Sequence, residues 1–264
     1  MLSEANYRMK SFITNRKLLR VAAVAGLLLI WHVAAWFIAK PLILPSPQVA
    51  LANLFLLVGS GEFWRHVAAT FTRGLFAFGL SLGIAIVLGL LAGKFQTVEA
   101  LFRPVMVCLR STPSMSFIIL ALLWFRGSNV SIFVITLMVL PLLFQNVVEG
   151  IRSIDSELLE MATLYRVKKS RLLLKLYLPS ILPFLAAGVS NGLGLTWKVS
   201  IAAEVLAYPA WGIGTQMDTA RVYLQTEMVF AWTAAVIGIG LIFDYLTDYL
   251  LRRPFTAWKG TEHV

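Results

Sequence analysis

The strongest constraint on this chain is a series of apolar runs, each long enough to cross a lipid bilayer. A membrane-spanning helix needs about 20 predominantly apolar residues, and six stretches of this chain meet that need. They are residues 21–39, 66–93, 104–125, 130–148, 178–206 and 228–250, the third interrupted by Ser111, Thr112, Pro113 and Ser114. We therefore expect an all-α, polytopic integral membrane protein with about six transmembrane helices.

Composition excludes the common soluble classes. Hydrophobic residues make up 59% of the 264 positions and charged residues 14%, whereas about a quarter of a soluble domain is charged. The same hydrophobicity excludes an intrinsically disordered chain. The single cysteine, Cys108, cannot form an intramolecular disulfide, and three scattered histidines do not have metal-ligand spacing. We predict neither a disulfide framework nor a metal site.

Membrane topology accounts for the formal charge of +10. Six spans place both termini on one side, and cytoplasmic segments of membrane proteins carry an excess of Lys and Arg. With the N-terminus in the cytoplasm, 17 of the 23 Lys and Arg residues fall on the cytoplasmic side. We therefore predict an N-in, C-in topology and no nucleic-acid partner. The corresponding organisation is a cytoplasmic segment at 1–20, a transmembrane domain at 21–254 and a cytoplasmic tail at 255–264.

Glycine is frequent in the second apolar run, and a further helix is expected outside the spans. The glycines are Gly74, Gly79, Gly83, Gly89 and Gly93. Small residues at such spacings let membrane helices approach closely, so we expect this helix to pack tightly against its neighbours. Residues 48–58 are apolar at helical spacing after a proline-rich start, which predicts a short interfacial helix.

The longest and most polar cytoplasmic interval, residues 149–178, separates the fourth and fifth spans. Its pattern predicts a helix over 156–165 and a second, basic helix over 169–177 that ends where Pro179 breaks the periodicity. A helix pair with an exposed apolar edge fits a docking surface for a partner protein. It fits equally well an amphipathic loop that rests on lipid headgroups, and the pattern alone leaves both open.

The same loop resembles the cytoplasmic coupling loop of binding-protein-dependent ABC importer permeases. That family carries Glu-Ala-Ala, three residues, Gly, nine residues and Ile-x-Leu-Pro. This chain has Glu160-Met161-Ala162, Arg166 and Leu176-Tyr177-Leu178-Pro179 at the same spacing. Because a residue with a side chain takes a positive φ less readily than glycine, Arg166 predicts that the turn differs or that the first helix runs on.

The resemblance covers residues 44–254 and favours the nitrate, sulfonate, taurine and bicarbonate branch of these permeases. It rests on a set of short motifs that occur in the expected order. They are Leu44-Pro45-Ser46-Pro47, Thr72-Arg73-Gly74, Ser111-Thr112-Pro113, Leu123-Trp124-Phe125, Ala203-Glu204 and Gly212-Ile213-Gly214. One further departure is Arg126, which stands where Gly normally follows Phe125.

The resemblance implies the permease subunit of an ATP-driven importer in the bacterial cytoplasmic membrane. Two permease copies, expected as a homodimer, would work with two ATPase subunits and an external solute-binding protein. Coupling to the ATPase is carried over to Glu160, Ala162, Arg166, Leu176, Leu178 and Pro179. The expected solute is a small anion such as a sulfonate, taurine or nitrate, and the alternative is a pyrimidine precursor of thiamine or another heterocycle.

Missing motifs separate this chain from enzymes. It has no G-x-x-x-x-G-K-[ST] loop to cradle phosphates, so ATP and Mg²⁺ are expected in the partner ATPase and no cofactor in this chain. Without H-E-x-x-H or G-x-S-x-G, a membrane-embedded hydrolase has no candidate site. A stand-alone secondary transporter or channel remains the rival class, although the inverted repeat that it predicts is not visible.

Ionisable residues within spans are costly and are therefore candidates for a role in the pathway or its gating. Arg73 and Glu204 lie at similar depths from the outer surface, so we expect an ion pair that either seals the outer pathway or fixes helix packing. Lys198 lies six residues deeper than Glu204, on another face of the helix. It would meet an anionic solute or pair with Asp244 of the last span. Gly212 and Gly214 complete the gating candidates.

Overall fold

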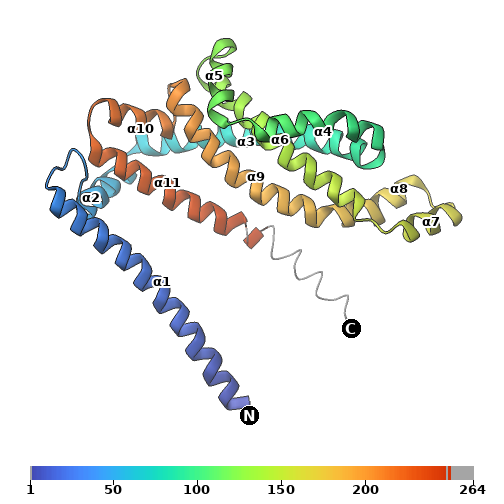
Figure 1. Ribbon diagram of the computed structural model, residues 1–264, viewed down its shortest axis with the longest axis horizontal. Helices are drawn as coiled ribbons and strands as arrows, with labels where there is room; N and C mark the ends of the chain where they lie inside the picture. The colour runs from blue at the N-terminus through green and yellow to red at the C-terminus, as the bar shows by residue number, and fades with distance from the viewer. Residues whose placement is uncertain (1, 248, 251–264) are drawn as a thin grey trace. The chain divides into compact units, whose positions relative to one another are not determined.

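The computed structural model describes residues 2–247 and 249–250, which are helical with no strand among them. The predicted tail at 255–264 lies outside these residues. In chain order the elements are α1 (Leu2–Ile38), α2 (Pro47–Val58), α3 (Gly61–Lys94), α4 (Gln96–Ser111), α5 (Ser114–Trp124), α6 (Ser128–Arg152), α7 (Ser156–Leu164), α8 (Lys169–Leu172), the π-helical turn η1 (Leu173–Tyr177), α9 (Leu178–Ala207), α10 (Ile213–Val222) and α11 (Thr226–Thr247) (Figure 1). The expected all-α class is confirmed.

The chain divides into two compact units, and the first contains the described residues up to Ser60 together with Thr219–Ala235. In this unit the indole of Trp31 stacks on Phe230 with ring centroids 5.4 Å apart. The Trp31 Nε1–H also donates to the Pro45 carbonyl over 3.0 Å. The short helix predicted over 48–58 is present as α2, which begins at Pro47, where a missing N–H costs nothing.

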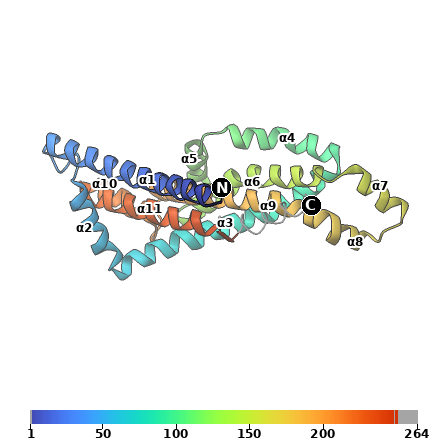
Figure 2. The ribbon, with the colours of Figure 1, turned by 90° about the horizontal axis from the view of Figure 1, so that it is seen from below.

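The second unit contains Gly61–Asp218 and the described residues from Val236 onward, and its centre is formed by α3, α6 and α9. These helices run side by side along the unit (Figures 1 and 2). The expected close approach occurs at the C-terminal end of α3, where a Cβ on Gly93 would lie 2.5 Å from Ile151 Cδ1 of α6. Gly79 and Gly83, in contrast, have no atom within 4 Å of that position. Only part of the glycine series therefore serves helix packing in this chain.

Five helical stretches in the described part are long and apolar enough to cross a membrane, and they lie in α1, α3, α6, α8–α9 and α11. The sixth predicted span is a broken pair: α4 and α5 meet at an angle of 100°. The run predicted over 104–125 is thus broken at the polar interruption that the sequence shows, and α5 turns away from α4 (Figure 1). Pro113 explains the break, because it forces the preceding Thr112 into an extended conformation with ψ 128°. The N-in, C-in orientation stays a prediction.

The loop at 149–178 contains the first predicted helix as α7 but not the predicted stop before the next span. The helix that begins with α8 continues through η1 into α9, with Tyr177 still in the α-helical region at φ −64°. In a regular helix the Pro179 ring would collide with the carbonyl four residues earlier. That carbonyl belongs to Lys175 in the wider π-helical turn, which makes room for the ring.

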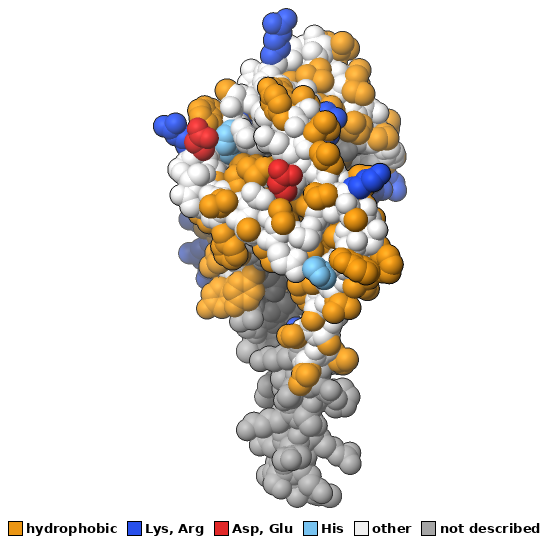
Figure 3. Space-filling view, turned by 90° about the vertical axis from the view of Figure 1, so that its left-hand side faces the viewer, with side chains coloured by type: hydrophobic (Ala, Val, Ile, Leu, Met, Phe, Trp, Pro, Cys, Tyr) orange, Lys and Arg blue, Asp and Glu red, His pale blue; other side chains and the backbone are white. Residues whose placement is uncertain are grey.

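Large apolar side chains remain exposed along several helices, as expected where the surrounding solvent is lipid. Phe37 on α1 and Phe55 on α2 are each 75% exposed. Hydrophobic side chains cover much of the face seen in Figure 3, with only scattered charged ones. Soluble proteins rarely expose apolar surface so extensively, so these surfaces suit a bilayer.

Candidate functional site

The α7 segment projects beyond the ends of α6 and α9, at one extremity of the second unit (Figures 1 and 2). None of its nine residues is buried. Asp155 is the N-cap residue of the helix, and its Oδ1 accepts a hydrogen bond from the Glu157 N–H over 2.9 Å. This cap satisfies one of the free N–H groups at the start of a helix. A short, exposed helix is thus fixed at its first residue.

The end of α7 is fixed by the turn that contains Arg166. Arg166 has a φ of +50°, in the left-handed region. Its N–H donates to the Thr163 carbonyl over 3.1 Å, and the Val167 N–H donates to the Ala162 carbonyl over 2.9 Å. These two bonds define a Schellman motif, in which the residue after the C-cap takes a positive φ. The helix therefore does not run on past Arg166, which was one of the two expectations, and the two main-chain bonds offset the conformational cost of the positive φ.

The six predicted coupling residues lie in two groups on this loop. Glu160 and Ala162 belong to α7 and Arg166 to its terminal turn, whereas Leu176 lies in η1 and Leu178 and Pro179 in the first turn of α9. An apolar edge accompanies the first group: Met161 is 51% exposed, Leu164 81% and Tyr165 75%. Both groups are therefore on the surface or half-buried, where a partner can reach them.

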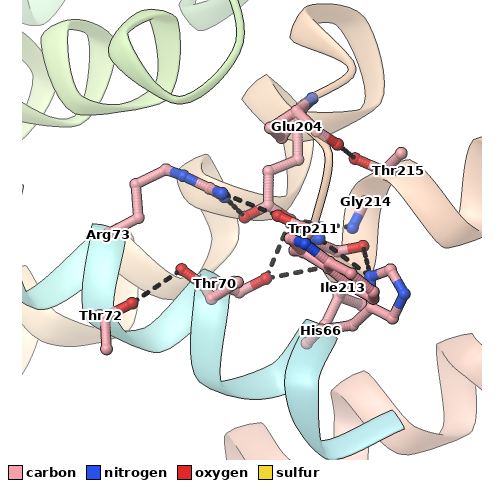
Figure 4. Close-up of polar contacts among 12 residues, drawn as sticks. His66, Thr70, Thr72, Arg73, Glu204, Trp211, Ile213, Gly214 and Thr215 are labelled. Atoms are coloured by element: carbon pink, nitrogen blue, oxygen red, sulfur yellow. Dashed lines mark hydrogen bonds and ion pairs between the residues drawn. The ribbon is translucent and has the colours of Figure 1, made fainter. Parts of the chain in front are cut away.

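Arg73 of α3 and Glu204 near the end of α9 form the expected ion pair (Figure 4). Their side chains are 7% and 0% exposed. The Glu204 carboxylate also accepts from the Thr70 hydroxyl over 3.0 Å and from the Gly214 N–H over 2.9 Å. Three donors thus bind one buried carboxylate. These bonds offset the free-energy cost of burying its negative charge.

Residues of α3 also bind the loop between α9 and α10, which joins the ion pair to one network (Figure 4). Arg73 Nη2 donates to the Trp211 carbonyl over 2.8 Å. The Ile213 N–H donates to the Thr70 hydroxyl over 3.0 Å. His66 Nδ1 lies 3.0 Å from the Gly212 main-chain nitrogen and 3.1 Å from the Gly212 carbonyl oxygen, so the imidazole is held against the main chain of this residue. We call His66, Thr70, Arg73, Glu204 and residues 211–214 the outer clamp.

Gly212 and Gly214 are required by the close approach of Glu204. A Cβ on Gly212 would lie 2.7 Å from the Glu204 carboxyl carbon. A Cβ on Gly214 would lie 2.7 Å from Glu204 Cβ and would overlap the Ile201 carbonyl oxygen. The motifs around Arg73, Glu204 and Gly212–Gly214 look separate in the sequence but meet in this one place.

The α3 members His66 and Thr70 of the outer clamp were not among the predicted site residues, and neither were Trp211 and Ile213. His66 and Thr70 precede Arg73 by seven and three positions, so all three share one face of α3. A search for polar residues at that spacing within an apolar helix would have found them. Their partners on the α9–α10 loop are main-chain groups, which carry no such signal.

Lys198 and Asp244 line one cavity of about 470 Å³, with Ser190, Asn191, Gly194, Leu195 and Thr247. Within the described part of the chain the Lys198 ammonium and Asp244 carboxylate do not form the ion pair that was one of the two expectations. Among the same residues no cluster of three His, Cys, Asp or Glu side chains could hold a metal ion.

Solved ABC transporters share this fold. Along 93% of this chain and 99% of the compared chain, it is similar to a bacterial ABC transporter involved in import of the polysaccharide alginate, with a TM-score of 0.60 and 17% identity. It is also similar to an inward-facing methionine ABC transporter, with a TM-score of 0.55 and 22% identity over 78% of this chain and 97% of the other. Residues 85–255 match the binding-protein-dependent transport system inner membrane component family. The chain belongs to that family.

Curated relatives match nearly the whole chain. It is 33% identical to a putative aliphatic sulfonates transport permease of Escherichia coli K12, over 94% of this chain and 95% of the relative. The taurine transport permease of the same organism is 28% identical, over 94% and 92%. The bicarbonate transport permease of Synechococcus elongatus is 28% identical, over 89% and 88%. The predicted branch is confirmed: the chain is a multi-pass permease subunit of the cytoplasmic membrane, and ATP hydrolysis belongs to a separate subunit.

Proposed function

We propose that this chain forms the transmembrane pathway of an importer that moves a small anionic solute, delivered by an external binding protein, at the expense of ATP. Two copies of the chain would work with two ATPase subunits. Taurine, aliphatic sulfonates and bicarbonate, which the relatives' names specify, each carry an anionic group. That shared chemistry favours an anion over a thiamine-precursor pyrimidine or another heterocycle.

The observation that carries the proposal is the shape of α7. Its start is fixed by Asp155 and its end by the turn at Arg166, although no residue of the helix is buried. An exposed apolar edge in water is unfavourable unless a partner covers it. A helix of this kind fits into an apolar groove of another protein. We infer that the groove belongs to the ATPase.

A displacement of α7 can be transmitted to the rest of the second unit along two routes. One leads into α6, at whose end Arg152 forms an ion pair with Glu99 of α4. The other leads through α8 and η1 into α9, without a break in the helix. With 30 residues, α9 is about 45 Å long. Its far end carries Glu204 of the outer clamp, so a displacement at the ATPase would reach the opposite side of the bilayer.

The test begins with the ATPase partner. The tagged chain is co-expressed with the ABC ATPase, and the complex is isolated and reconstituted into liposomes with the binding protein. We expect stoichiometric co-purification and taurine or ethanesulfonate uptake that needs ATP. Substituting Leu164→Asp or Met161→Asp should lower co-purification about tenfold or more, because each places a charge in an apolar contact. Ser156→Asp, in the first turn of the same helix, is the matched control, since an acid is favoured there.

Three results would contradict the proposal, the third of them only in its solute class. Full uptake by this chain without an ATPase would make it a secondary transporter or channel. Unchanged co-purification of the Leu164→Asp and Met161→Asp variants would mean that the apolar edge of α7 rests on lipid headgroups instead. Uptake of a pyrimidine and of no anion would overturn the solute class while leaving the ATPase coupling intact.

A further inference from the structure

Two opposite charges lie in membrane-spanning helices of the second unit and share a cavity. Lys198 is on α9 and Asp244 is on α11, and both side chains line the same space of about 470 Å³. Charged groups within spans are costly and are kept where they meet each other, water or a transported solute. The lining and size of this cavity therefore indicate whether the two charges pair with each other, contact water or bind a solute.

The cavity brings the two charges near each other without joining them. A Cβ on Gly194 would lie 3.6 Å from Asp244 Oδ1. Lys198 follows Gly194 by one helical turn, and residues so spaced have Cβ atoms about 6 Å apart. Both side chains thus reach the same space, yet the described chain has no ion pair between the ammonium and the carboxylate.

The α9 wall of the cavity has the residues that a solute site requires. Ser190, Gly194 and Lys198 recur every four positions and so lie on one face of the helix, with Asn191 beside them. The missing side chain at Gly194 leaves Asp244 accessible from the cavity. Sites for small molecules have volumes from about 300 to 1,000 Å³ with a few placed polar groups, and this cavity lies in that range.

We propose that this cavity binds a zwitterion, with its anionic group at Lys198 and its ammonium group at Asp244. The inference rests on the proposed function and narrows its solute class. A simple anion would satisfy Lys198 but would be repelled by Asp244, whose carboxylate would stay unpaired. An aminoalkyl sulfonate or a similar short zwitterion satisfies both charges and adds no net charge to the membrane interior.

The experiment measures binding directly, without the external binding protein. Radiolabelled taurine is titrated onto the detergent-solubilised permease–ATPase complex, and unlabelled ethanesulfonate, which lacks the ammonium group, competes. Asp244→Asn should weaken taurine binding about tenfold or more, because a charge-assisted contact is lost. Competition by ethanesulfonate should be as strong as before or stronger. Lys198→Met should weaken both ligands, and Lys94→Met, at the end of α3, is the matched control.

Other outcomes would overturn the proposal. Equal losses of taurine and ethanesulfonate binding in Asp244→Asn would mean that the carboxylate does not face the ammonium group. A second such outcome is that the double variant Lys198→Met/Asp244→Asn binds taurine as well as the unaltered complex does. The two charges would then only neutralise each other between α9 and α11, without binding the solute. Absence of taurine binding by the unaltered complex would also reject the site. If ATPase co-purification persists in that case, the inference fails alone and the proposed function stands.

Discussion

Glu204, near the C-terminal end of α9, is bound to Arg73 of α3 across 131 positions of sequence. The carboxylate is a triple acceptor, since the Thr70 hydroxyl and the Gly214 N–H donate to it as well. Position 204 therefore requires an acceptor and not merely a charge opposite to that at position 73. The ends of two spans and the loop that follows α9 are held by this single side chain.

A charge swap tests this requirement. The double variant Arg73→Glu/Glu204→Arg keeps one charge of each sign, but arginine has no acceptor for the Thr70 hydroxyl and the Gly214 N–H. We expect it to be as inactive as Arg73→Glu alone. Glu204→Gln keeps one acceptor oxygen yet leaves the buried Arg73 guanidinium without its counter-charge, which costs about 3–5 kcal/mol. Thermal unfolding in detergent and ATP-driven uptake measure both effects. Recovery of uptake in the swapped variant would show that charge balance alone matters.

Replacing a glycine of the outer clamp with alanine tests whether the α9–α10 loop has to approach Glu204 closely. In Gly214→Ala the new Cβ would lie 2.7 Å from Glu204 Cβ, so the α9–α10 loop must move away from the carboxylate. Overpacking of this kind costs about 1–3 kcal/mol, and we expect a lower unfolding temperature and reduced uptake. Gly79→Ala is the control, because nothing lies within 4 Å of its Cβ position. Equal stability of the two variants would argue against a fixed clamp.

The spans were predictable because about 20 apolar residues in a row leave a polypeptide few alternatives to a membrane helix. The polar interruption around Pro113 shows where the third span breaks, but the size of the bend between α4 and α5 was not predictable. The angle between two helices depends on what packs around them, and periodicity does not record it. The helix α10 was also missed, because Ile213–Val222 mixes polar and apolar residues without a clear run.

The candidate site, like the fold, was predictable only in part. Equal depth in the bilayer was enough to predict the pair of Arg73 and Glu204. The contacts of Gly212 and Ile213 were not predictable, because main-chain groups form them and any residue supplies such groups. Lys198 was placed in the pathway by its depth, but its separation from Asp244 depends on rotamers that periodicity cannot specify.

The turn after α7 gives a prediction about backbone strain. Arg166→Gly removes the cost of a left-handed residue, about 1 kcal/mol, and loses a similar amount through a more flexible unfolded chain. We therefore expect unchanged ATPase co-purification and unfolding temperature. Arg166→Val should weaken both, because a branched side chain is strained at a positive φ. A Gly variant that no longer binds the ATPase would show that the arginine side chain, not the turn, makes the contact.

The contact of α3 with α6 predicts a position-specific packing defect. In Gly93→Leu the side chain would collide with Ile151, since even a Cβ would lie 2.5 Å from Ile151 Cδ1. We expect the helices to separate and the unfolding temperature in detergent to fall. Gly83→Leu makes the same change on the same helix, where a Cβ meets no atom within 4 Å. If Gly83→Leu destabilises the protein as much, the loss reflects helix propensity or lipid contact and not the approach to α6.

The turn at Arg166 also bears on how such loops are recognised in other sequences. Its shape comes from hydrogen bonds of the Ala162 and Thr163 carbonyls, so the residue that takes the positive φ is free to vary at modest cost. A pattern that insists on glycine there would pass over this chain. A partner that fits the backbone contour would accept it, and would meet a cation where other loops of this kind present no side chain.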